Sequence, residues 1–360
     1  MKAAVLYDIN APLQIEQFVL PDIEDDQVRV RLVASGVCHS DWHVIKGEWP
    51  FIQVPTILGH EGAGVVEEIG PSVNNVKVGD HVVLSWKRNC GFCEMCQVGY
   101  PNLCDEPADP RGLPRFTESD RQMDKFNGLG TFSTETIVPQ DIVIPIDKEI
   151  PLPQAALVGC GVMTGVGAVL NTANVQPGKS VAVFGCGGVG LNVIQGAMMA
   201  GAEPIIAVDI LDNKLELSKQ FGATHTVNSS QVDPVKAIQE LTDGQGTHYA
   251  FEAIGLVSDP FKQSILCTRK RGVTVYVGHA PVNTPVDFDA RILFLEKTVI
   301  GSFYGTCRPR VDFPRLLALY KAGKLKLDEL VTRIYPLEEV NEAFTALSQG
   351  EVARSVLDLA

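Results

Sequence analysis

A strand that runs directly into a glycine-rich turn is the feature of this sequence that most limits its fold. The apolar strand Val181–Phe184 is followed by Gly-Cys-Gly-Gly-Val-Gly and then by helix-forming residues, and a second apolar strand ends at Asp209. In such a turn Gly185 permits the tight bend, Gly187 lets the backbone approach a phosphate, and Gly190 lets the helix pack against the strand. Strand, glycine turn, helix and acid in this order predict a parallel βαβ unit that binds a dinucleotide.

The same turn predicts how the dinucleotide is held. The helix that begins near Gly188 and Val189 would offer N–H groups and a positive potential to the pyrophosphate. Asp209 would accept hydrogen bonds from the ribose 2′- and 3′-hydroxyls, and its charge would repel a 2′-phosphate, which favours NAD over NADP. A structural glycine turn followed by a surface aspartate is the alternative. It would not require strand, turn, helix and acid to occur in register.

The rest of the chain shows two different patterns of secondary structure. Up to about residue 146, short β-branched runs are separated by Gly, Pro and Asp. After Pro177, apolar strands alternate with helical stretches of roughly a dozen residues, which predicts a doubly wound parallel sheet. The strands expected there are 181–184, 205–209, 225–228, 249–252 and 273–277.

Beyond Phe303 the pattern becomes helical again, at 313–322 and 337–348, and the chain ends in a short strand. The simplest arrangement is a β-rich domain interrupted by a nucleotide-binding domain, with a tail that returns to the first domain. The corresponding boundaries are 1–161 for the β-rich domain, 162–303 for the nucleotide-binding domain and 304–360 for the tail.

Length, composition and charge exclude several classes of protein. A chain of 360 residues with 45% apolar and 20% charged residues has the size and composition of a two-domain globular enzyme. The formal net charge of −13 would repel nucleic-acid phosphates and anionic lipids. The N-terminus lacks an apolar signal segment, and the weakly polar run 155–170 is too short and glycine-rich to span a bilayer. We therefore expect a cytoplasmic protein that binds neither nucleic acid nor membranes.

The cysteines predict a metal site. The chain has nine, an odd number, and four of them lie close together: Cys90, Cys93, Cys96 and Cys104. Tetrahedral zinc needs four soft ligands, and the short loops between these residues can bring four thiolates together. Because four protein ligands leave no position for water, the site would be structural. Disulfides or free thiols are the alternative, which a chain without a secretion signal does not favour.

Three residues outside this cluster have the chemistry of metal ligands but are far apart in the sequence. Cys38 lies in Gly-Val-Cys-His-Ser-Asp, His60 in Gly-His-Glu-Gly-Ala-Gly, and Cys160 in Gly-Cys-Gly-Val-Met-Thr-Gly. Taken singly, a buried cysteine is usually a small hydrophobic residue, and a histidine beside a glutamate is usually an ordinary polar residue. Spacing alone therefore leaves both interpretations open.

These motifs, with the cysteine cluster and the glycine turn, make the chain resemble the zinc-containing medium-chain alcohol dehydrogenases, in the branch of the liver-type and formaldehyde-dehydrogenase-like enzymes. The resemblance extends from the first strand to the final Arg354-Ser-Val-Leu, and the five motifs occur in the family's order. It implies an α/β fold in which a GroES-like, β-rich catalytic domain is joined to a Rossmann domain with a doubly wound parallel sheet. It also implies a homo-oligomer, either a dimer or a tetramer.

The resemblance further implies a catalytic zinc. In the family, the residues that match Cys38, His60 and Cys160 bind this zinc, and water or the substrate oxygen is its fourth ligand. The residue that matches Glu61 lies close behind the metal, and the match to Asp41 orients the zinc-bound histidine through its other ring nitrogen. Two zinc ions per chain, one catalytic and one structural, are therefore expected.

The chemistry that the resemblance implies is hydride transfer between an alcohol and NAD. Zinc lowers the pKa of the alcohol oxygen, and the resulting alkoxide passes a hydride to the nicotinamide. Ser40 matches the residue that receives the alcohol proton and passes it through the cofactor ribose to the match of His43, which would exchange it with solvent. A histidine titrates near neutrality and suits that role. An ordinary exposed histidine is the alternative for His43.

Other residues match positions that contact the cofactor or the substrate. His39 and Arg354 match phosphate-binding positions, and Lys214 matches a contact to the adenosine ribose. The remaining expected cofactor contacts are Thr164, Val189 and Val277. Trp86 matches an aromatic residue of the substrate pocket, and ordinary core packing is its alternative interpretation.

The stretch 105–130 departs from the animal liver enzymes, because it is shorter and carries several charges. In the family it helps line the substrate channel, so pocket residues cannot be transferred across it, and Leu129 is only a candidate. Arg111 or Arg115 could bind an anionic co-substrate such as a glutathione adduct. A solvated charged loop is the simpler interpretation.

We therefore expect a zinc- and NAD-dependent alcohol dehydrogenase that interconverts primary or secondary alcohols with aldehydes or ketones. A glutathione-dependent formaldehyde dehydrogenase of the same fold is the second enzymatic hypothesis. A polyol dehydrogenase is disfavoured, because that branch commonly replaces the third catalytic cysteine with glutamate and Cys160 is present. A dinucleotide-binding protein without catalytic activity is the non-enzymatic alternative, and the intact ligands and relay argue against it.

Overall fold

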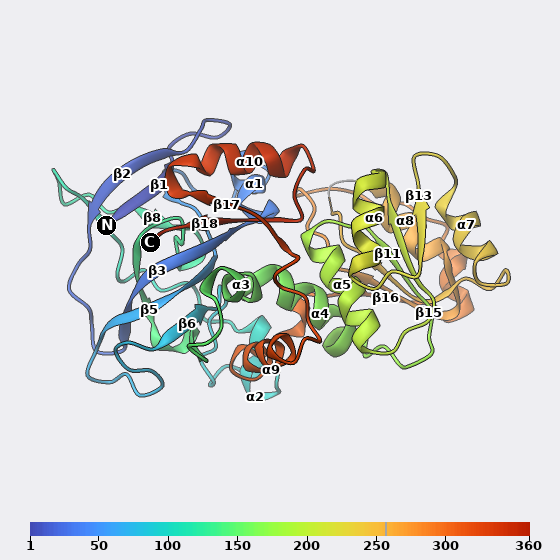
Figure 1. Cartoon of the computed structure of the whole chain (residues 1–360), viewed down its shortest axis with the longest axis horizontal. Helices are drawn as coiled ribbons and strands as arrows, with labels where there is room; N and C mark the ends of the chain where they lie inside the picture. The colour runs from blue at the N-terminus through green and yellow to red at the C-terminus, as the bar shows by residue number, and fades with distance from the viewer. Residues whose placement is uncertain (256–257) are drawn as a thin grey trace. The chain divides into compact units, whose positions relative to one another are not determined.

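The computed structural model of the chain describes residues 1–255 and 258–360 (Figure 1). The chain divides into two compact units, one formed by residues 1–160 and 308–360 and the other by residues 161–307. The boundaries expected from the sequence, 161/162 and 303/304, lie one and four residues away from these divisions.

The first unit contains two β-sheets. The larger runs β10-β6-β5-β3-β18-β17, with β9 paired to β3, and the smaller runs β7-β2-β1-β4-β8. The strands are β1 (Lys2–Leu6), β2 (Gln14–Val19), β3 (Gln27–Val37), β4 (Thr56–Ile57), β5 (Glu61–Ile69), β6 (His81–Leu84), β7 (Arg115–Phe116), β8 (Asp124–Lys125), β9 (Glu135–Pro139), β10 (Val143–Ile146), β17 (Val331–Pro336) and β18 (Arg354–Asp358). The helices are α1 (His39–Ile45), α2 (Glu94–Gln97), α3 (Leu152–Leu157), α9 (Pro309–Lys321) and α10 (Val340–Ser348).

Strand β3 organises the larger sheet. It pairs antiparallel with β5, β9 and β18. Val28, Val30 and Leu32 are fully buried, because alternate residues of a strand point to the same face and this face meets the core. The pairing of β18 with β3 places Val356 opposite Gly36, so the C-terminal tail completes the sheet of the first unit.

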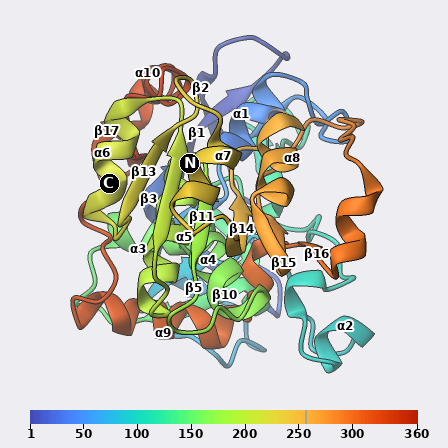
Figure 2. The same cartoon turned by 90° about the vertical axis from the view of Figure 1, so that its right-hand side faces the viewer.

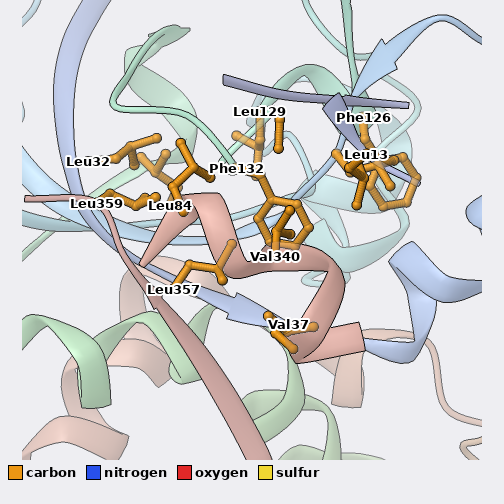
Figure 3. Packing of buried hydrophobic residues seen from close by; sticks show 14 of the residues in the cluster. Leu13, Leu32, Val37, Leu84, Phe126, Leu129, Phe132, Val340, Leu357 and Leu359 are labelled. Atoms are coloured by element: carbon orange, nitrogen blue, oxygen red, sulfur yellow. The ribbon is translucent and has the colours of Figure 1, made fainter. Parts of the chain in front are cut away.

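The core of the first unit joins this sheet to helix α10 (Figure 3). Leu32, Leu84 and Leu357 come from three strands of the sheet and belong to one buried cluster. Val340, at the start of α10, and Phe132 belong to the same cluster. Burying each such side chain contributes about 1.5–3 kcal/mol. The core therefore holds the ends of β3 and β5 in place, and two of the candidate metal ligands, Cys38 and His60, lie next to those ends.

The second unit is a parallel sheet with the strand order β13-β12-β11-β14-β15-β16 (Figure 2). Its strands are β11 (Val181–Phe184), β12 (Ile205–Asp209), β13 (His225–Asn228), β14 (Thr247–Glu252), β15 (Thr268–Tyr276) and β16 (Thr298–Gly301). Its helices are α4 (Met163–Gly167), α5 (Gly188–Met199), α6 (Asp212–Gln220), α7 (Pro234–Glu240) and α8 (Ser258–Leu266).

Strands β11 and β12 are buried along their whole length, as expected where helices cover both faces. The predicted Rossmann arrangement is confirmed, with β11 next to the point where the strand order reverses.

The strands predicted for the second unit agree closely with those observed. Residues 181–184, 205–209 and 225–228 match β11, β12 and β13 at both ends, whereas β14 and β15 begin two and five residues earlier than predicted. The helix expected at 313–322 begins at Pro309, because proline suits the first position of a helix. The segment expected to be helical at 337–348 opens with the 3-10 turn Leu337–Glu339.

One apolar segment, Leu152–Thr172, is long and apolar enough to cross a membrane by length and composition alone. Of its most apolar window, 78% is buried inside the protein. It consists of α3, α4 and two π-helical turns rather than one regular helix. This burial agrees with the interior place predicted for residues 155–170.

Candidate active site

Four buried side chains from the first unit meet at one point. Their ligand atoms, one each from Cys38, His60, Glu61 and Cys160, all lie within 4.8 Å of one another. Cys38 follows β3 and is the N-cap of α1, His60 directly precedes β5, and Cys160 lies in a π-helical turn. Because β3 and β5 pair next to these positions, the sheet register itself brings Cys38 and His60 together.

Asp41 fixes the orientation of the His60 ring. Nδ1 of His60 lies 3.3 Å from Oδ1 of Asp41, and the same oxygen accepts the N–H of Gly59 at 2.9 Å. A carboxylate only accepts hydrogen bonds, so Nδ1 carries the hydrogen and Nε2 presents its lone pair. Nε2 is buried and has no hydrogen-bond partner among the described residues, which is the arrangement of a histidine that binds a metal. Asp41 therefore has the geometry that its predicted orienting role requires.

The electrostatics of the cluster suit a cation. The Cys160 thiol, together with the charge of Arg354, holds the pKa of Cys38 well below its usual range, although burial opposes this shift. The hydrogen bond with Cys38 and burial raise the pKa of Cys160. Two thiols that share a proton in this way both become thiolates when a divalent cation replaces the proton. Two sulfurs and one imidazole nitrogen form a ligand set that zinc prefers, and they leave one position for water or substrate.

Glu61 is held next to the thiols by a buried ion pair. Arg354, the first residue of β18, donates to its carboxylate, and the two side chains are 5% and 0% exposed. Gly36 makes room for this carboxylate, because a Cβ atom there would lie 1.9 Å from Oε2 of Glu61. The pairing of β18 with β3 carries Arg354 into the interior, where its guanidinium donates to Glu61. The contact with a cofactor phosphate that the family resemblance implies for Arg354 stays a prediction.

The second cluster is the lobe formed by Cys90, Cys93, Cys96 and Cys104. Three of its sulfur pairs are 3.5–3.9 Å apart. Tetrahedral zinc with bonds of about 2.3 Å would separate its sulfur ligands by roughly 3.8 Å, so the geometry fits a zinc ion. Backbone N–H groups of the loop donate to the sulfurs of Cys90 and Cys93 at 3.4–3.5 Å, which stabilises thiolates. None of the nine cysteines, all of which lie in the described residues, forms a disulfide, so the disulfide alternative is wrong.

The glycine turn of the second unit leaves open space where a dinucleotide phosphate is expected. Gly185 has a φ of +94°, a conformation that favours glycine. A Cβ atom at Gly190 would lie 1.7 Å from the carbonyl oxygen of Gly185, so only glycine allows helix α5 this close to the turn. A Cβ atom at Gly187, the N-cap of α5, would meet no atom within 4 Å. The turn thus combines a helix N-terminus with open space, which suits an anion.

Asp209 also holds the turn itself, which the sequence motifs did not indicate. Its Oδ2 accepts the N–H of Cys186 at 2.8 Å, and its Oδ1 accepts the N–H groups of Ile210 and Leu211 at 2.8 and 3.1 Å. The side chain is 9% exposed. Each carboxylate oxygen can accept more than one hydrogen bond, so this arrangement is compatible with the predicted contact to a ribose diol.

His43 is buried, so the alternative of an ordinary exposed histidine is wrong, whereas its role in the proton relay stays a prediction. The side chain is 3% exposed, and its ring stacks on that of Trp49 with centroids 4.9 Å apart. Nδ1 of His43 lies 2.5 Å from Oε2 of Glu48, a residue that no motif singled out. The turn after α1 folds these two neighbours back against the helix, and an acid five residues after the histidine was the signal that could have indicated the pair. Ser40, the other predicted relay residue, lies with its Oγ 3.7 Å from Sγ of Cys38.

The surroundings of the cluster include an aromatic residue that the sequence did not predict. The ring of Phe126 meets that of His60 edge-on, with centroids 5.4 Å apart, and lies 6.4 Å from that of Trp49. Leu129, the pocket candidate from the same stretch, is fully buried in the core cluster. Trp86 is partly buried against this cluster, and its place in a substrate pocket stays a prediction.

The charged stretch after the cysteine lobe is anchored by Arg111. Its guanidinium binds Asp109 at 2.6 Å, Asp26 at 2.8 Å and Glu24 at 3.2 Å. Asp109 is almost fully buried, and its hydrogen bonds to Arg111 lower its pKa although burial opposes this shift. A guanidinium that already binds three carboxylates is poorly suited to hold an anionic co-substrate.

The remaining residues predicted to contact the cofactor are distributed over both units. His39 is exposed, Val277 is buried, and the half-buried residues are Thr164, Val189 and Lys214. Their contacts with a dinucleotide stay predictions.

The chain is similar to known proteins over nearly its whole length. Residues 24–148 match the alcohol dehydrogenase GroES-like domain, and residues 188–322 match the zinc-binding dehydrogenases. The chain is 40% identical to the NDMA-dependent alcohol dehydrogenase of Amycolatopsis methanolica, over 99% of this chain and 98% of that protein. It is 38% identical to the "Probable S-(hydroxymethyl)glutathione dehydrogenase 1" of Schizosaccharomyces pombe, over 99% of this chain and 97% of that protein.

Among solved structures, the benzyl alcohol dehydrogenase of Acinetobacter calcoaceticus is similar to this chain with a TM-score of 0.93 and 35% identity. The match covers 100% of this chain and 99% of that one. Both family models, the relatives and the fold agree with the ordered motifs of the sequence. The chain therefore belongs to the zinc-binding, medium-chain alcohol dehydrogenase family.

Proposed function

We propose that this chain is a zinc- and NAD-dependent alcohol dehydrogenase that transfers hydride reversibly between a primary or secondary alcohol and NAD. The observation that carries the proposal is the buried cluster of Cys38, His60 and Cys160, in which Nε2 of His60 has no hydrogen-bond partner among the described residues. One zinc ion would bind there and a second in the lobe of four cysteines. The chain would then hold two zinc ions and one NAD.

The residues of the first cluster fit a catalytic zinc rather than a structural one. Two sulfurs and one nitrogen leave a coordination position for an alcohol oxygen. A zinc ion bound there supplies a Lewis acid for that oxygen, and NAD bound at the glycine turn supplies the hydride acceptor. Cys38, His60 and Cys160 are between 1% and 8% exposed, so water is largely excluded and electrostatic interactions are strong.

The protein's own groups position the reacting atoms. Asp41 holds His60 in the tautomer that can bind a metal. Arg354 compensates the charge of Glu61, so the cluster does not carry an additional unpaired carboxylate. Ser40 and His43 would take up the alcohol proton, by the relay that the family resemblance implies.

Asp209 supports NAD rather than NADP as the cofactor. Its carboxylate lies at the end of β12 and is fixed by the N–H of Cys186 in the glycine turn. A negative charge at this position would repel a 2′-phosphate and would accept hydrogen bonds from a ribose diol.

The expected partner is a small-molecule alcohol or aldehyde. A homo-oligomer, a cytoplasmic location and the absence of nucleic-acid and membrane partners remain predictions of the sequence.

Replacing Cys160 with alanine tests the proposal. The substitution removes one of three ligands, so the variant should hold about one zinc ion per chain and lose alcohol-dependent reduction of NAD. Atomic absorption measures the zinc, and absorbance measures the NADH that forms. Cys267→Ala is the matched control, because Cys267 is buried but belongs to neither cluster, and this variant should keep both ions and the activity. Unchanged zinc content and activity in Cys160→Ala would refute the proposal.

A second candidate function is that of an S-(hydroxymethyl)glutathione dehydrogenase, because a relative with that name is 38% identical. The three carboxylates on Arg111 argue against this residue as the site of an anionic adduct. Comparing kcat/KM for primary, secondary and aromatic alcohols with kcat/KM for the hydroxymethyl adduct of glutathione separates the two functions. A chain that binds NADH but reduces no aldehyde would instead support the non-catalytic alternative.

A further inference from the structure

His43 and Glu48 form a histidine–carboxylate pair within the candidate relay. Nδ1 of His43 lies 2.5 Å from Oε2 of Glu48. The imidazole is 3% exposed and the side chain of Glu48 is 33% exposed, so the acid is the member of the pair that reaches solvent. Because a carboxylate only accepts hydrogen bonds, Nδ1 carries a hydrogen and Nε2 is the atom that accepts a further proton.

The backbone places Glu48 opposite the ring. The N–H of Glu48 donates to the carbonyl oxygen of His43 at 2.9 Å, and the N–H of Lys46 donates to that of Trp42 at 2.9 Å. Gly47 has a φ of +70°, which lets the chain reverse direction between helix α1 and the acid. The pair therefore follows from the path of the backbone and not only from the conformation of a long side chain.

Trp49 stacks on one face of the His43 ring and limits its movement. The two ring planes lie 16° apart with centroids separated by 4.9 Å, and Trp49 itself is 7% exposed. Phe51 and Phe126 flank Trp49 at centroid distances of 6.0 and 6.4 Å. An imidazole that is stacked on one face and hydrogen-bonded at Nδ1 has one favoured orientation, because a flip of the ring would break the bond to the acid.

We propose that Glu48 is a positioning residue of the reaction, which acts through His43. It holds the ring in the Nδ1–H tautomer, and its negative charge lies beside the ring that becomes positive when the alcohol proton arrives at Nε2. An acid that sets the tautomer of a histidine is an established catalytic device. The proton that His43 gains is the one that the alcohol loses, and it is released to solvent before the next turnover. This inference rests on the proposed function, since it assigns a task within that relay.

Glu48→Gln is the decisive substitution, because the amide keeps the size of the side chain but removes the charge and can donate to Nδ1. The kcat of alcohol oxidation should fall about ten- to a hundredfold, the worth of a hydrogen bond to a charged group. Zinc content and the Kd of NADH should not change. Glu48→Asp keeps the charge and should retain more activity than Glu48→Gln. Glu67→Gln is the matched control, because Glu67 forms a surface ion pair with Arg31, and its kcat should equal that of the wild type.

A double-mutant cycle shows whether Glu48 acts through His43. In a His43→Asn background, Glu48→Gln should cause no further loss of kcat, because the group that it positions is gone. An equal loss in both backgrounds would mean that Glu48 acts on something other than His43, and it would overturn the inference.

The ¹⁵N NMR spectrum of the imidazoles reports the tautomer without turnover. Among the seven histidines, the signals of His43 are those that disappear in His43→Asn. The wild type should show the Nδ1–H tautomer, and Glu48→Gln should shift the ring towards Nε2–H. An unchanged tautomer with a wild-type kcat in Glu48→Gln would overturn the inference. A tautomer shift in a chain that oxidises no alcohol would confirm the pair but refute the proposed function, and with it the catalytic task of Glu48.

Discussion

Arg354 and Glu61 form an ion pair that is sealed from solvent, although 293 residues separate them along the chain. β18 begins at Arg354, and its pairing with β3 places the guanidinium where its charge favours the thiolate forms of Cys38 and Cys160. The C-terminal strand therefore contributes a charge to the candidate metal site as well as a strand to the sheet.

Arg354→Met should destabilise the first unit. The substitution leaves the carboxylate of Glu61 buried without its partner, which costs about 3–5 kcal/mol. Urea unfolding followed by circular dichroism should show a lower midpoint than that of the wild type. Adding Glu61→Gln should recover part of the loss, because it removes the unpaired charge. A double variant that is less stable than Arg354→Met alone would show that the two side chains do not compensate each other.

Gly187→Ala should weaken the binding of NADH, whereas Gly190→Ala should lower the stability of the fold. A methyl group at Gly190 would lie 1.7 Å from the carbonyl oxygen of Gly185, so helix α5 must shift and the thermal midpoint should fall. A methyl group at Gly187 enters open space, so stability should stay within about 0.5 kcal/mol. The Kd of NADH should nevertheless rise in Gly187→Ala, because the methyl group occupies the space expected for the pyrophosphate. Thermal unfolding and fluorescence titration with NADH measure the two effects, and equal destabilisation by both substitutions would contradict this view.

Asp209→Gly should weaken the preference for NAD over NADP. It removes both the acceptor for the ribose diol and the charge that repels a 2′-phosphate. It also removes the hydrogen bond to the N–H of Cys186, so kcat/KM should fall with NAD even where NADP is tolerated. Asp209→Asn can keep that hydrogen bond without the charge and separates the two effects. The ratio of kcat/KM with NAD to kcat/KM with NADP is the measurement, and an unchanged ratio in Asp209→Gly would contradict the assignment.

Lys125 should make stability depend on pH. The residue is 7% exposed, its Nζ donates to the carbonyl oxygens of Gly112 and Ile137, and burial lowers its pKa to about 7. An unfolded lysine has a pKa of about 10.4. Between these two values the unfolded chain binds more protons than the folded chain, so the free energy of unfolding rises with pH in this window. Below the lower value both states are protonated and the dependence disappears.

Comparison with Lys125→Met isolates this contribution, because the variant has no titrating group at that position. From pH 7 to pH 10 the wild type should gain stability relative to the variant, as measured by urea unfolding at each pH. A constant difference over this range would show that Lys125 keeps its proton when it is buried.

Local patterns were sufficient for much of the fold. The strands at 181–184, 205–209 and 225–228 follow from short apolar runs between glycine turns and helical stretches. The sulfurs of Cys90 and Cys104 meet because only short loops separate the four cysteines. In each case the groups that determine the structure are near neighbours in the sequence.

Sequence proximity was not sufficient for the relay. Glu48 is only five residues from His43, yet its contact with Nδ1 depends on the reversal at Gly47 and on the packing of Trp49. Arg354 matched a family position, but the register of β18 directs its guanidinium to a carboxylate in the interior.

By itself, the sequence determined the order of the elements, the glycine turn and the cysteine lobe, because apolar periodicity and short loops act over a few residues. Only the tertiary structure decided that Cys38, His60 and Cys160 meet, since the pairing of β3 with β5 and the turn that carries Cys160 bring them to one point. The tertiary structure also decided the partners of the buried charges, because a charge that is removed from water is stable only beside a group that compensates it.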